Sequence, residues 1–470
     1  MSDRLLAFYG DDITGSTDAM DALSRRGVDV VLFLDPPTTE TVNEQFGDVP
    51  AVGVAGTSRS MTPAEMDEAL PPVFEALSEL DAPLVHYKIC STFDSSPDIG
   101  NVGRAIDLAF DAFDAESVPI LPAAPPLGRH VTFGNMFAKD EDDVYRLDRH
   151  PTMSEHPVTP MDEGDLRRHL GKQTDRPMGL VDIRAVQNGV EATTARLNDE
   201  LAADPDIVFF DSLTDEDLLT VGEVTWEQYA ADPSSSSGSD PAEDAESAFV
   251  VGSSGVEYAL SGHWKNAGMV TDDPAFDPLE PVDELFVMSG SAAPVTDTQI
   301  STAVAAGFES IRIDTEALVD PDAIADERAR VVEKSIAALR EGDSVVAYTA
   351  RGPDDPAIEE TKERARALDS APTDVGRHIG EQQGEILREV LETIEFPRVV
   401  VAGGDTCGHV TPALDIYALQ SRFPLAAGTP VCRAHARAER FDGLEIALNG
   451  GQLGGPEYFV RAKEGADDWG

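Results

Sequence analysis

Short β-rich apolar runs alternate with longer amphipathic stretches along this chain, and this alternation restricts the fold more than any other sequence feature. The first half holds β-rich runs at residues 4–10, 29–35, 49–56, 83–90, 117–123, 178–184 and 206–213. Helical periodicity lies between them, at residues 15–27, 62–80 and 101–113. Strands separated by helices form a mostly parallel sheet with helices on both faces, so the pattern predicts an α/β fold.

One segment interrupts the alternation. Residues 230–248 are rich in Ser, Asp and Pro and lack apolar periodicity, which is typical of an exposed linker or loop. A second alternation follows, with β-rich runs from residue 249 onward. We therefore expect two α/β domains with a cleft between them: a first domain at 1–230, a linker at 231–248 and a second domain at 249–470.

The charge balance excludes two classes of partner. The chain has 88 Asp and Glu residues against 35 Lys and Arg, a formal net charge of -53. Such a charge repels nucleic acid and anionic membrane surfaces, so we expect neither as a partner. Lysine occurs only seven times, and an acid-rich, lysine-poor surface suits concentrated salt, where screening weakens repulsion between exposed carboxylates. We therefore expect a halophilic protein.

The cysteines and the apolar runs indicate the compartment. Cys90, Cys407 and Cys432 are isolated, and this spacing predicts neither a disulfide framework nor a zinc site. No apolar run reaches the roughly 20 residues of a membrane span, and the N-terminus lacks the pattern of a signal peptide. These features predict a cytoplasmic protein.

Two adjacent carboxylates, Asp11 and Asp12, follow the first β-rich run directly. Ligands of doubly wound sheets lie beyond the carboxyl ends of the strands. Either carboxylate at such an end could orient a substrate hydroxyl, accept its proton or hold a metal. The structural alternative is that Asp12 caps the helix that follows and that Asp11 is exposed.

Two further stretches carry candidate substrate ligands. Lys88 lies inside a β-rich run, and a polar loop with Ser91 and Asp94 follows it. In a chain that avoids lysine, Lys88 is a candidate for pairing with an anionic substrate, and the alternative is a strand-edge lysine that extends to solvent. A Pro- and Gly-rich loop carries Arg129, which either grips a carboxylate with two parallel hydrogen bonds or pairs with a surface acid.

Three glycine-rich turns lie in the second half, at residues 287–300, 399–410 and 447–455. Each follows a β-rich run, and the first two lead into a helix-like stretch. Backbone N–H groups of such turns, with a helix N-terminus behind them, form a phosphate cradle, so a nucleotide is the favoured ligand. The sequence lacks the P-loop, the Rossmann fingerprint and the G-x-S-x-G nucleophile elbow. A nucleotide site of the P-loop type, a dinucleotide site of the usual Rossmann type and a serine nucleophile on such an elbow are therefore not expected.

These stretches, in this order, resemble the four-carbon acid sugar kinase family. The matching segments are GDDITGSTD, YKICSTFDSS, GNVG, LPAAPPLGR, HPVTPM, SLTDEDLLTVG, SGSAAPVT, VAGGDTCG and LNGGQLGG, from near residue 5 to near residue 460. The form KICSTFDSS is more similar to the 3-oxo-tetronate kinase branch than to the threonate and erythronate kinases. The resemblance implies an N-terminal domain that binds the sugar acid and a C-terminal domain that binds ATP.

The resemblance also implies a reaction: phosphorylation of the terminal hydroxyl of a four-carbon sugar acid by ATP with Mg²⁺. The first candidate acceptor is 3-oxo-tetronate, and D-threonate, D-erythronate or a related acid are the others. On this mapping Asp12 is the catalytic carboxylate and Asp11 supports it, while Lys88, Ser91, Asp94 and Arg129 bind the sugar acid. The ATP-binding residues are Ser289, Gly290, Ser291, Gly403, Gly404, Asp405, Thr406, Gly450 and Gly451.

Two segments depart from the family pattern. GGDT has Asp405 where the family usually has Glu, and SGSAAP stands where a Cys-Ser pair is common. The shorter carboxylate leaves the magnesium ligands unassigned. Two other interpretations stay open: a sugar-acid and nucleotide sensor without catalysis, and a haloacid-dehalogenase-type phosphatase, whose nucleophile loop is loosely matched by DITGS. The sequence also leaves open whether the chain forms a homo-oligomer.

Overall fold

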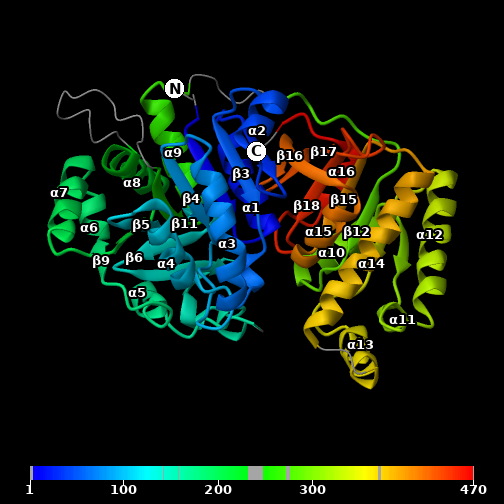
Figure 1. Ribbon diagram of the computed structural model, residues 1–470. Coiled ribbons are helices and arrows are strands. Elements are labelled where there is room, and N and C mark those ends of the chain that lie inside the picture. Colours follow the sequence, from blue (N-terminus) through cyan, green and yellow to red (C-terminus); the bar gives the residue numbers. More distant parts are fainter. Residues whose placement is uncertain are drawn as a thin grey trace. The chain divides into compact units, whose positions relative to one another are not determined.

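The computed structural model describes residues 4–140, 142–156, 158–230, 247–270, 276–368 and 372–468. The chain divides into two compact units, Met1–Ala275 and Phe276–Gly470. Each unit contains a mostly parallel sheet with helices packed around it, which confirms the expected α/β fold (Figure 1). The cleft expected between the domains stays a prediction. Of the expected linker, residues 231–246 lie outside the described residues.

The sheet of the first unit is parallel throughout the described residues. Its strands lie in the order β2 (Val30–Phe33), β3 (Ala51–Ala55), β1 (Leu6–Gly10), β4 (Leu84–Lys88), β11 (Ala248–Gly252), β5 (Val118–Leu121), β10 (Ile207–Phe210) and β9 (Met178–Val181). The helices are α1 (Ile13–Ser24), α2 (Thr39–Phe46), α3 (Pro63–Ser78), α4 (Val102–Phe113), α5 (Leu166–Leu170), α6 (Ile183–Val186), α7 (Val190–Leu201), α8 (Asp215–Thr225) and α9 (Gly255–Asn266). The central strands are buried along their whole length, as helices on both faces require.

The boundary of the first unit differs from the expected one. Strand β11 pairs in parallel with both β4 and β5, and helix α9 packs against α8. Residues 249–266, which the sequence pattern assigned to the second domain, therefore complete the sheet of the first. A polar, aperiodic segment marks an exposed connection, but only long-range strand pairing decides to which sheet the next strand belongs.

A small antiparallel sheet adds to the first unit. It consists of β6 (Arg129–Thr132), β7 (Asn135–Asp140) and β8 (Asp143–Arg146). The turn between β6 and β7 has positive φ at Phe133 and Gly134, and the buried Asp211 carboxylate accepts hydrogen bonds from both of their N–H groups. Asp211 thus ties this hairpin to the end of β10.

The sheet of the second unit is mixed. Strands β13 (Glu309–Arg312), β14 (Val345–Tyr348), β12 (Phe286–Ser289), β15 (Arg398–Ala402) and β18 (Glu445–Asn449) are parallel, and β17 (Thr429–Ala436) and β16 (Ile416–Ala426) continue the sheet antiparallel. The helices are α10 (Pro294–Ala305), α11 (Thr315–Leu318), α12 (Ile324–Glu341), α13 (Pro356–Ala367), α14 (Pro372–Thr393), α15 (Gly404–Ala413) and α16 (Tyr458–Glu464). As expected, β12 leads through a glycine-rich turn into α10, and β15 leads into α15.

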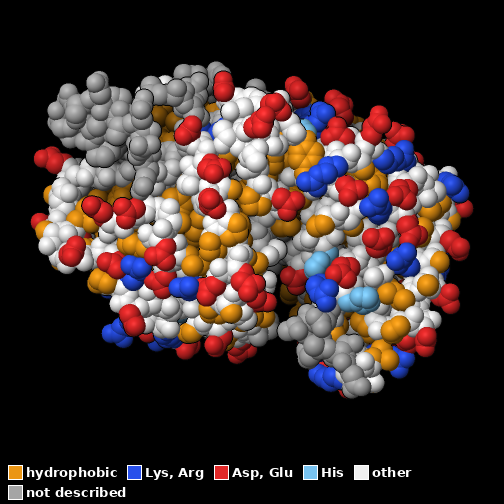
Figure 2. Space-filling view, viewed as in Figure 1, with side chains coloured by type: hydrophobic (Ala, Val, Ile, Leu, Met, Phe, Trp, Pro, Cys, Tyr) orange, Lys and Arg blue, Asp and Glu red, His pale blue; other side chains and the backbone are white. Residues whose placement is uncertain are grey.

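Carboxylates are dispersed over the face of the protein that Figure 2 draws. Figure 2 shows Asp and Glu side chains spread across the visible face, with fewer Lys and Arg side chains between them. No helix in the described part of the chain is long and apolar enough to span a membrane.

Candidate functional site

The carboxyl ends of three neighbouring strands of the first unit bring the N-terminal motifs together. Strands β1 and β4 pair in parallel with Gly10 opposite Lys88, so the residues that follow them lie at one edge of the sheet. The Asp11 N–H donates to the Lys88 carbonyl oxygen over 2.9 Å. Strand β3, the other neighbour of β1, leads to Arg59, whose N–H donates to the Asp11 carbonyl oxygen over 3.0 Å.

Asp12 caps helix α1, as the structural alternative predicted. Its Oδ1 accepts the Gly15 N–H, and the other oxygen, Oδ2, accepts a hydrogen bond from Arg59 Nη1 over 2.6 Å. The side chain is still 25% exposed. Burial would raise the pKa of Asp12, but the positive charges of Arg59 and Lys88 outweigh it, and the pKa lies below its usual value. Asp12 is therefore ionised at neutral pH.

Asp11 is buried, with 5% of its surface exposed, and the alternative that placed it in solvent is wrong. Its Oδ2 accepts the Cys90 N–H over 3.3 Å, and its Oδ1 has no hydrogen-bond partner among the described residues. Burial and the neighbouring Asp12 carboxylate raise the pKa of Asp11 to about 7. Of the adjacent pair, Asp12 is thus ionised at neutral pH, and Asp11 titrates near neutrality.

Lys88 is only 2% exposed, and it ends a central strand, so the strand-edge alternative is wrong. Its Nζ lies 3.8 Å from Asp18 Oδ2. A Cβ on Gly15 would come within 2.4 Å of Lys88 Nζ and 2.6 Å of Asp12 Oδ1, so the glycine leaves the room that this ammonium group occupies beside Asp12. Burial would lower the pKa of Lys88, but the carboxylates of Asp18, Asp12 and Asp11 outweigh it and keep the lysine charged.

Arg59 is the residue of this site that the sequence patterns did not single out. Its two Nη groups bridge separate carboxylates, Asp12 at 2.6 Å and Asp94 at 2.7 Å. Asp94 also accepts hydrogen bonds from the Thr92 hydroxyl over 2.6 Å and the Thr159 hydroxyl over 3.3 Å. Burial would raise the pKa of Asp94, but Arg59 and Thr92 hold it below its usual value.

The GNVG segment supports the loop that carries Arg59. Gly100 has φ +61°, and a Cβ there would meet the Arg59 carbonyl oxygen at 2.6 Å, so only glycine fits. We call Asp11, Asp12, Arg59, Lys88 and Asp94 the strand-end cluster. The cluster combines two buried or half-buried cations with three carboxylates, which suits the binding of a polyhydroxy anion and the orientation of its hydroxyl groups.

The other two predicted substrate ligands lie differently. Ser91 is half-buried in the loop that joins Lys88 to Asp94. Arg129 begins β6 and donates to the Leu127 carbonyl oxygen of its own loop, and its buried Nε has no partner among the described residues. No hydrogen bond or ion pair in the described chain joins Arg129 to the strand-end cluster. Its role in sugar-acid binding stays a prediction.

In the second unit, the three glycine-rich turns lie against one another. They follow β12, β15 and β18, which are neighbours in the sheet. The Gly290 N–H donates to the Ala402 carbonyl oxygen over 2.8 Å, and the Gly403 N–H donates to that of Asn449 over 2.7 Å. The Thr296 hydroxyl, on α10, donates to the Gly451 carbonyl oxygen over 2.8 Å. The turns thus form one continuous strand-end surface.

Several glycines in these turns have no room for a side chain. A Cβ on Gly290 would lie 2.0 Å from Thr406 Oγ1, and one on Gly451 would lie 2.2 Å from Ser291 Oγ. Gly403 has φ +122° and precedes the first turn of α15. Because α10 and α15 both begin at this edge, two helix N-termini and the N–H groups of the turns are available to an anion such as a nucleotide phosphate.

A cavity of about 320 Å³ adjoins these turns. Gly290, Asp405 and Thr406 line it on the side of the turns, and Ile358, Val375 and Ile379 give it an apolar wall. A cavity with a few polar groups at one end and an apolar wall is typical of small-ligand sites. The arrangement fits a nucleotide whose base lies in the cavity and whose phosphates lie on the turns.

The described residues contain no group of three or more His, Cys, Asp and Glu side chains arranged to hold a metal. Mg²⁺ in phosphoryl-transfer sites is commonly held by one or two carboxylates together with the substrate phosphates. Asp405, in the first turn of α15 and on the wall of the cavity, is a carboxylate of that kind. The donor set therefore fits a magnesium ion that arrives with the nucleotide.

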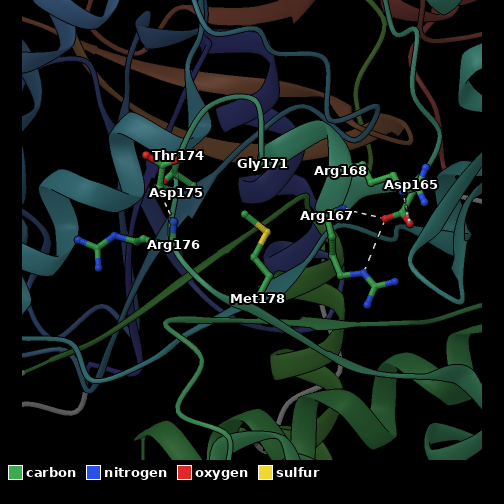
Figure 3. A pocket seen from close by; sticks show the side chains of 8 residues that line it. All are labelled: Asp165, Arg167, Arg168, Gly171, Thr174, Asp175, Arg176 and Met178. Atoms are coloured by element: carbon green, nitrogen blue, oxygen red, sulfur yellow. Dashed lines mark hydrogen bonds and ion pairs between the residues drawn. The ribbon is translucent and has the colours of Figure 1, made fainter.

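A second cavity, of about 540 Å³, lies in the first unit beside α5 and β9. Three arginines line it, but Figure 3 shows Arg176 pointing away from Arg167 and Arg168, with Met178 between them. Asp165 lies within ion-pair distance of Arg167 and Arg168, and Arg176 pairs with two other aspartates, at positions 107 and 206. Because these charges do not converge and are already paired, the arrangement does not form an anion site.

Two family models match this chain, one for the most part in each unit. A family model described as a sugar-binding N-terminal domain matches residues 6–260, and one described as a nucleotide-binding C-terminal domain matches residues 286–459. The strand-end cluster lies in the first match, and the three glycine-rich turns lie in the second. The first match extends through β11 into the first half of α9, and the pairing of β11 with β4 likewise assigns β11 to the first unit.

Named relatives cover nearly the whole chain. A 3-oxo-isoapionate kinase from Paraburkholderia graminis is 43% identical over 98% of this chain and 94% of its own. A 3-oxo-tetronate kinase from Pseudomonas fluorescens is 30% identical over 97% of this chain and 96% of its own. The chain is therefore more similar to the former than to the latter.

Two solved structures share the fold. A crystal structure from Salmonella typhimurium LT2, described as a putative tRNA synthase, has a TM-score of 0.74 at 24% identity and covers 97% of this chain and 98% of its own. A Haemophilus influenzae protein has a TM-score of 0.70 at 21% identity and covers 97% and 99%. At these identities the likeness supports the fold alone.

Proposed function

The chain belongs to the four-carbon acid sugar kinase family, and from this premise we propose that it transfers the γ-phosphoryl group of ATP to the terminal hydroxyl of a 3-oxo sugar acid. Members of the family are phosphotransferases with an alcohol group as acceptor, and this chain is a sugar-acid kinase. The observation that carries the proposal is similarity to named kinases over 97–98% of the chain, across both the sugar-binding and the nucleotide-binding matches.

The first candidate acceptor is 3-oxo-isoapionate. The chain is 43% identical to a kinase named for that acid and 30% identical to one named for 3-oxo-tetronate. This ranking replaces the preference for 3-oxo-tetronate that the KICSTFDSS segment suggested. Acceptors of this class carry a carboxylate and several hydroxyl groups, which suit the cations and carboxylates of the strand-end cluster.

On the acceptor side, Asp12 orients the terminal hydroxyl and takes its proton as the new O–P bond forms. Its low pKa makes it a weak base in the ground state, but phosphoryl transfer depends mainly on positioning and charge neutralisation, with proton transfer completing the step. Asp11, the buried neighbour of Asp12, supports the position of the Asp12 carboxylate. The charged Lys88 ammonium group pairs with the anionic substrate.

On the donor side, the turns of the second unit hold the ATP phosphates through Gly290, Ser291, Gly403, Gly404 and Thr406. Asp405 would hold a magnesium ion, which neutralises phosphate charge during transfer. The adenine base of ATP occupies the cavity of about 320 Å³. Each unit thus binds one of the two substrates.

The test is a coupled assay of ADP release with 3-oxo-isoapionate, 3-oxo-tetronate, D-threonate and D-erythronate. It is run in molar KCl, because a chain with a net charge of -53 suits concentrated salt. We expect the highest kcat/KM with 3-oxo-isoapionate and, in each active case, one phosphorylated acid per ADP. If no sugar acid releases ADP, the proposed function fails.

The same assay decides between the kinase and the other interpretations. A sensor that has lost catalysis binds a sugar acid and ATP in calorimetry but releases no ADP. A haloacid-dehalogenase-type phosphatase releases phosphate from a sugar-acid phosphate without ATP. Family membership favours the kinase over both, and sugar-acid-dependent ADP release contradicts both.

A further inference from the structure

Helix α14 brings a buried glutamine to the nucleotide cavity. Gln383 is 1% exposed, and it lines the cavity together with Gly290 and Thr406. Its Oε1 accepts a hydrogen bond from the Thr406 hydroxyl over 3.3 Å. Neither the glycine-rich motifs nor the family models' descriptions single out this residue.

Two glycines of α14 explain why Gln383 lies so close to Thr406. A Cβ on Gly380 would lie 2.3 Å from the His409 ring, and one on Gly384 would lie 2.8 Å from Ala413 Cβ and 3.0 Å from the His409 carbonyl oxygen. Both contacts are with α15, so the two helices approach each other at their glycines. Gln383, which directly precedes Gly384 in α14, is thereby held against the first turn of α15.

One half of the Gln383 amide lacks a partner. Its Nε2 is buried and has no hydrogen-bond partner among the described residues, while Oε1 is engaged by Thr406. A buried amide donor without an acceptor destabilises the folded protein, so a donor retained on a cavity wall indicates an acceptor that arrives with a ligand.

We propose that Gln383 is a nucleotide-binding residue whose side-chain amide donates a hydrogen bond to a phosphate oxygen of the bound nucleotide. This inference rests on the proposed function. The amide lies beside the glycine-rich turns, where the phosphates are proposed to bind. Its Oε1 accepts the hydrogen bond from Thr406, and a Cβ on Gly290 would lie 2.8 Å from the same oxygen. The acceptor of the Nε2 hydrogen bond is therefore a phosphate oxygen rather than an atom of the base. The apolar wall that suits a base is formed by Ile358, Val375 and Ile379.

The test compares Gln383→Met with Gln382→Met by calorimetric titration of the intact protein with ADP and with adenosine, in molar KCl with Mg²⁺. Methionine preserves the length of the side chain and removes the amide. Gln382 is the matched control: it is the preceding residue of the same helix, and its amide oxygen accepts from Arg328 Nη1 at 3.4 Å, outside the cavity.

A hydrogen bond to a charged phosphate predicts that Gln383→Met weakens ADP binding by about 10- to 100-fold, whereas adenosine binding and the control change by less than about 2-fold. Gln383→Glu places a carboxylate at the same position and should weaken ADP binding further, which keeps the test valid if the methionine variant is unstable. Unchanged ADP affinity in a folded Gln383 variant overturns the inference, and so does an equal loss for adenosine. If the wild-type protein binds no ADP, the proposed function itself fails.

Discussion

Arg59 Nη1 and Asp12 Oδ2 lie 2.6 Å apart, so the carboxylate that caps α1 is also one end of an ion-pair bridge. The other Nη group of the same guanidinium reaches Asp94. The planar fork therefore fixes the separation between the loop after β1 and the loop after β4. An ammonium group cannot serve two carboxylates in this fixed geometry, because it is a single point charge on a flexible chain.

Arg59→Lys should lower kcat for the sugar acid by a factor on the order of 10 to 100, because the charge stays while the positions of Asp12 and Asp94 are no longer fixed. Burial raises the pKa of both carboxylates, and a lysine, which can pair with only one of them, opposes this rise less than Arg59 does. The acid limb of the kcat profile should therefore move to higher pH. The measurement is ADP release between pH 5 and 9, with thermal melting of each variant.

Arg176→Lys is the matched control for that experiment. Arg176 also bridges two aspartates of the first unit, Asp107 at 2.6 Å and Asp206 at 2.8 Å, but outside the strand-end cluster. We expect it to change stability without moving the pH profile. If both variants lose activity in proportion to their melting temperatures and keep the wild-type profile, Arg59 has only a structural role.

Asp12→Asn should reduce turnover by a factor on the order of 10² or more while the protein stays folded. The asparagine oxygen still accepts the Gly15 N–H, so the cap of α1 survives, while the basic carboxylate and its pairing with Arg59 are lost. Asp182→Asn is the comparison, since Asp182 caps α6 and pairs with Arg184. A decrease in activity no larger than the loss of stability explains would favour a capping role alone.

Asp11 should make stability depend on pH in the direction opposite to that of a salt-bridged acid. Its pKa is raised to about 7 in the folded state, mainly by burial and by Asp12, while the unfolded value is the ordinary one of 3.8. The stability that comes from the neutral form is complete below about pH 4 and is lost as the pH rises through 7. The charges facing it are Asp12, Lys88, Arg59 and Asp94.

Asp11→Asn keeps the side chain neutral at every pH. The melting temperature of this variant should therefore rise relative to that of the wild type as the pH increases from 4.5 to 8. Scanning calorimetry of both proteins at one KCl concentration measures this difference in melting temperature. The contributions of most other titrating groups are the same in both proteins and cancel in the difference. A difference that stays flat or falls with pH would show that Asp11 is ionised in the folded protein throughout this range.

Much of the architecture follows from local sequence. The motifs at Asp11, Gly403 and Gly450 come directly after β-rich runs, and Lys88 ends one. Because parallel strands end at the same edge of a sheet, the convergence of these motifs within each unit is predictable. The helix cap at Asp12 is also predictable from local sequence, because it depends only on the neighbouring residues of α1.

The rest depends on contacts between distant residues. Arg59 meets Asp12 across 47 positions of sequence, and Gln383 meets Thr406 across 23. Nothing in the residues next to either one marks it, although the position of Arg59 shortly after the β-rich run at 49–56 was an available signal. The place of β11 in the first sheet is likewise decided by its pairing with β4 and β5 rather than by the polar segment before it.

The final prediction concerns the turn between β15 and α15. Gly403 has φ +122°, whereas Gly404 is not among the glycines with positive φ and begins the helix, so valine at 404 adds a side chain without backbone strain of that kind. If this turn holds the ATP phosphates, Gly404→Val should weaken ADP binding by at least about 10-fold, because the new side chain lies where backbone N–H groups must approach an anion. Sugar-acid binding, followed by calorimetry without nucleotide, should stay near the wild-type value, since the strand-end cluster belongs to the other unit. Undiminished ADP affinity in a well-folded variant would remove this turn from the nucleotide site.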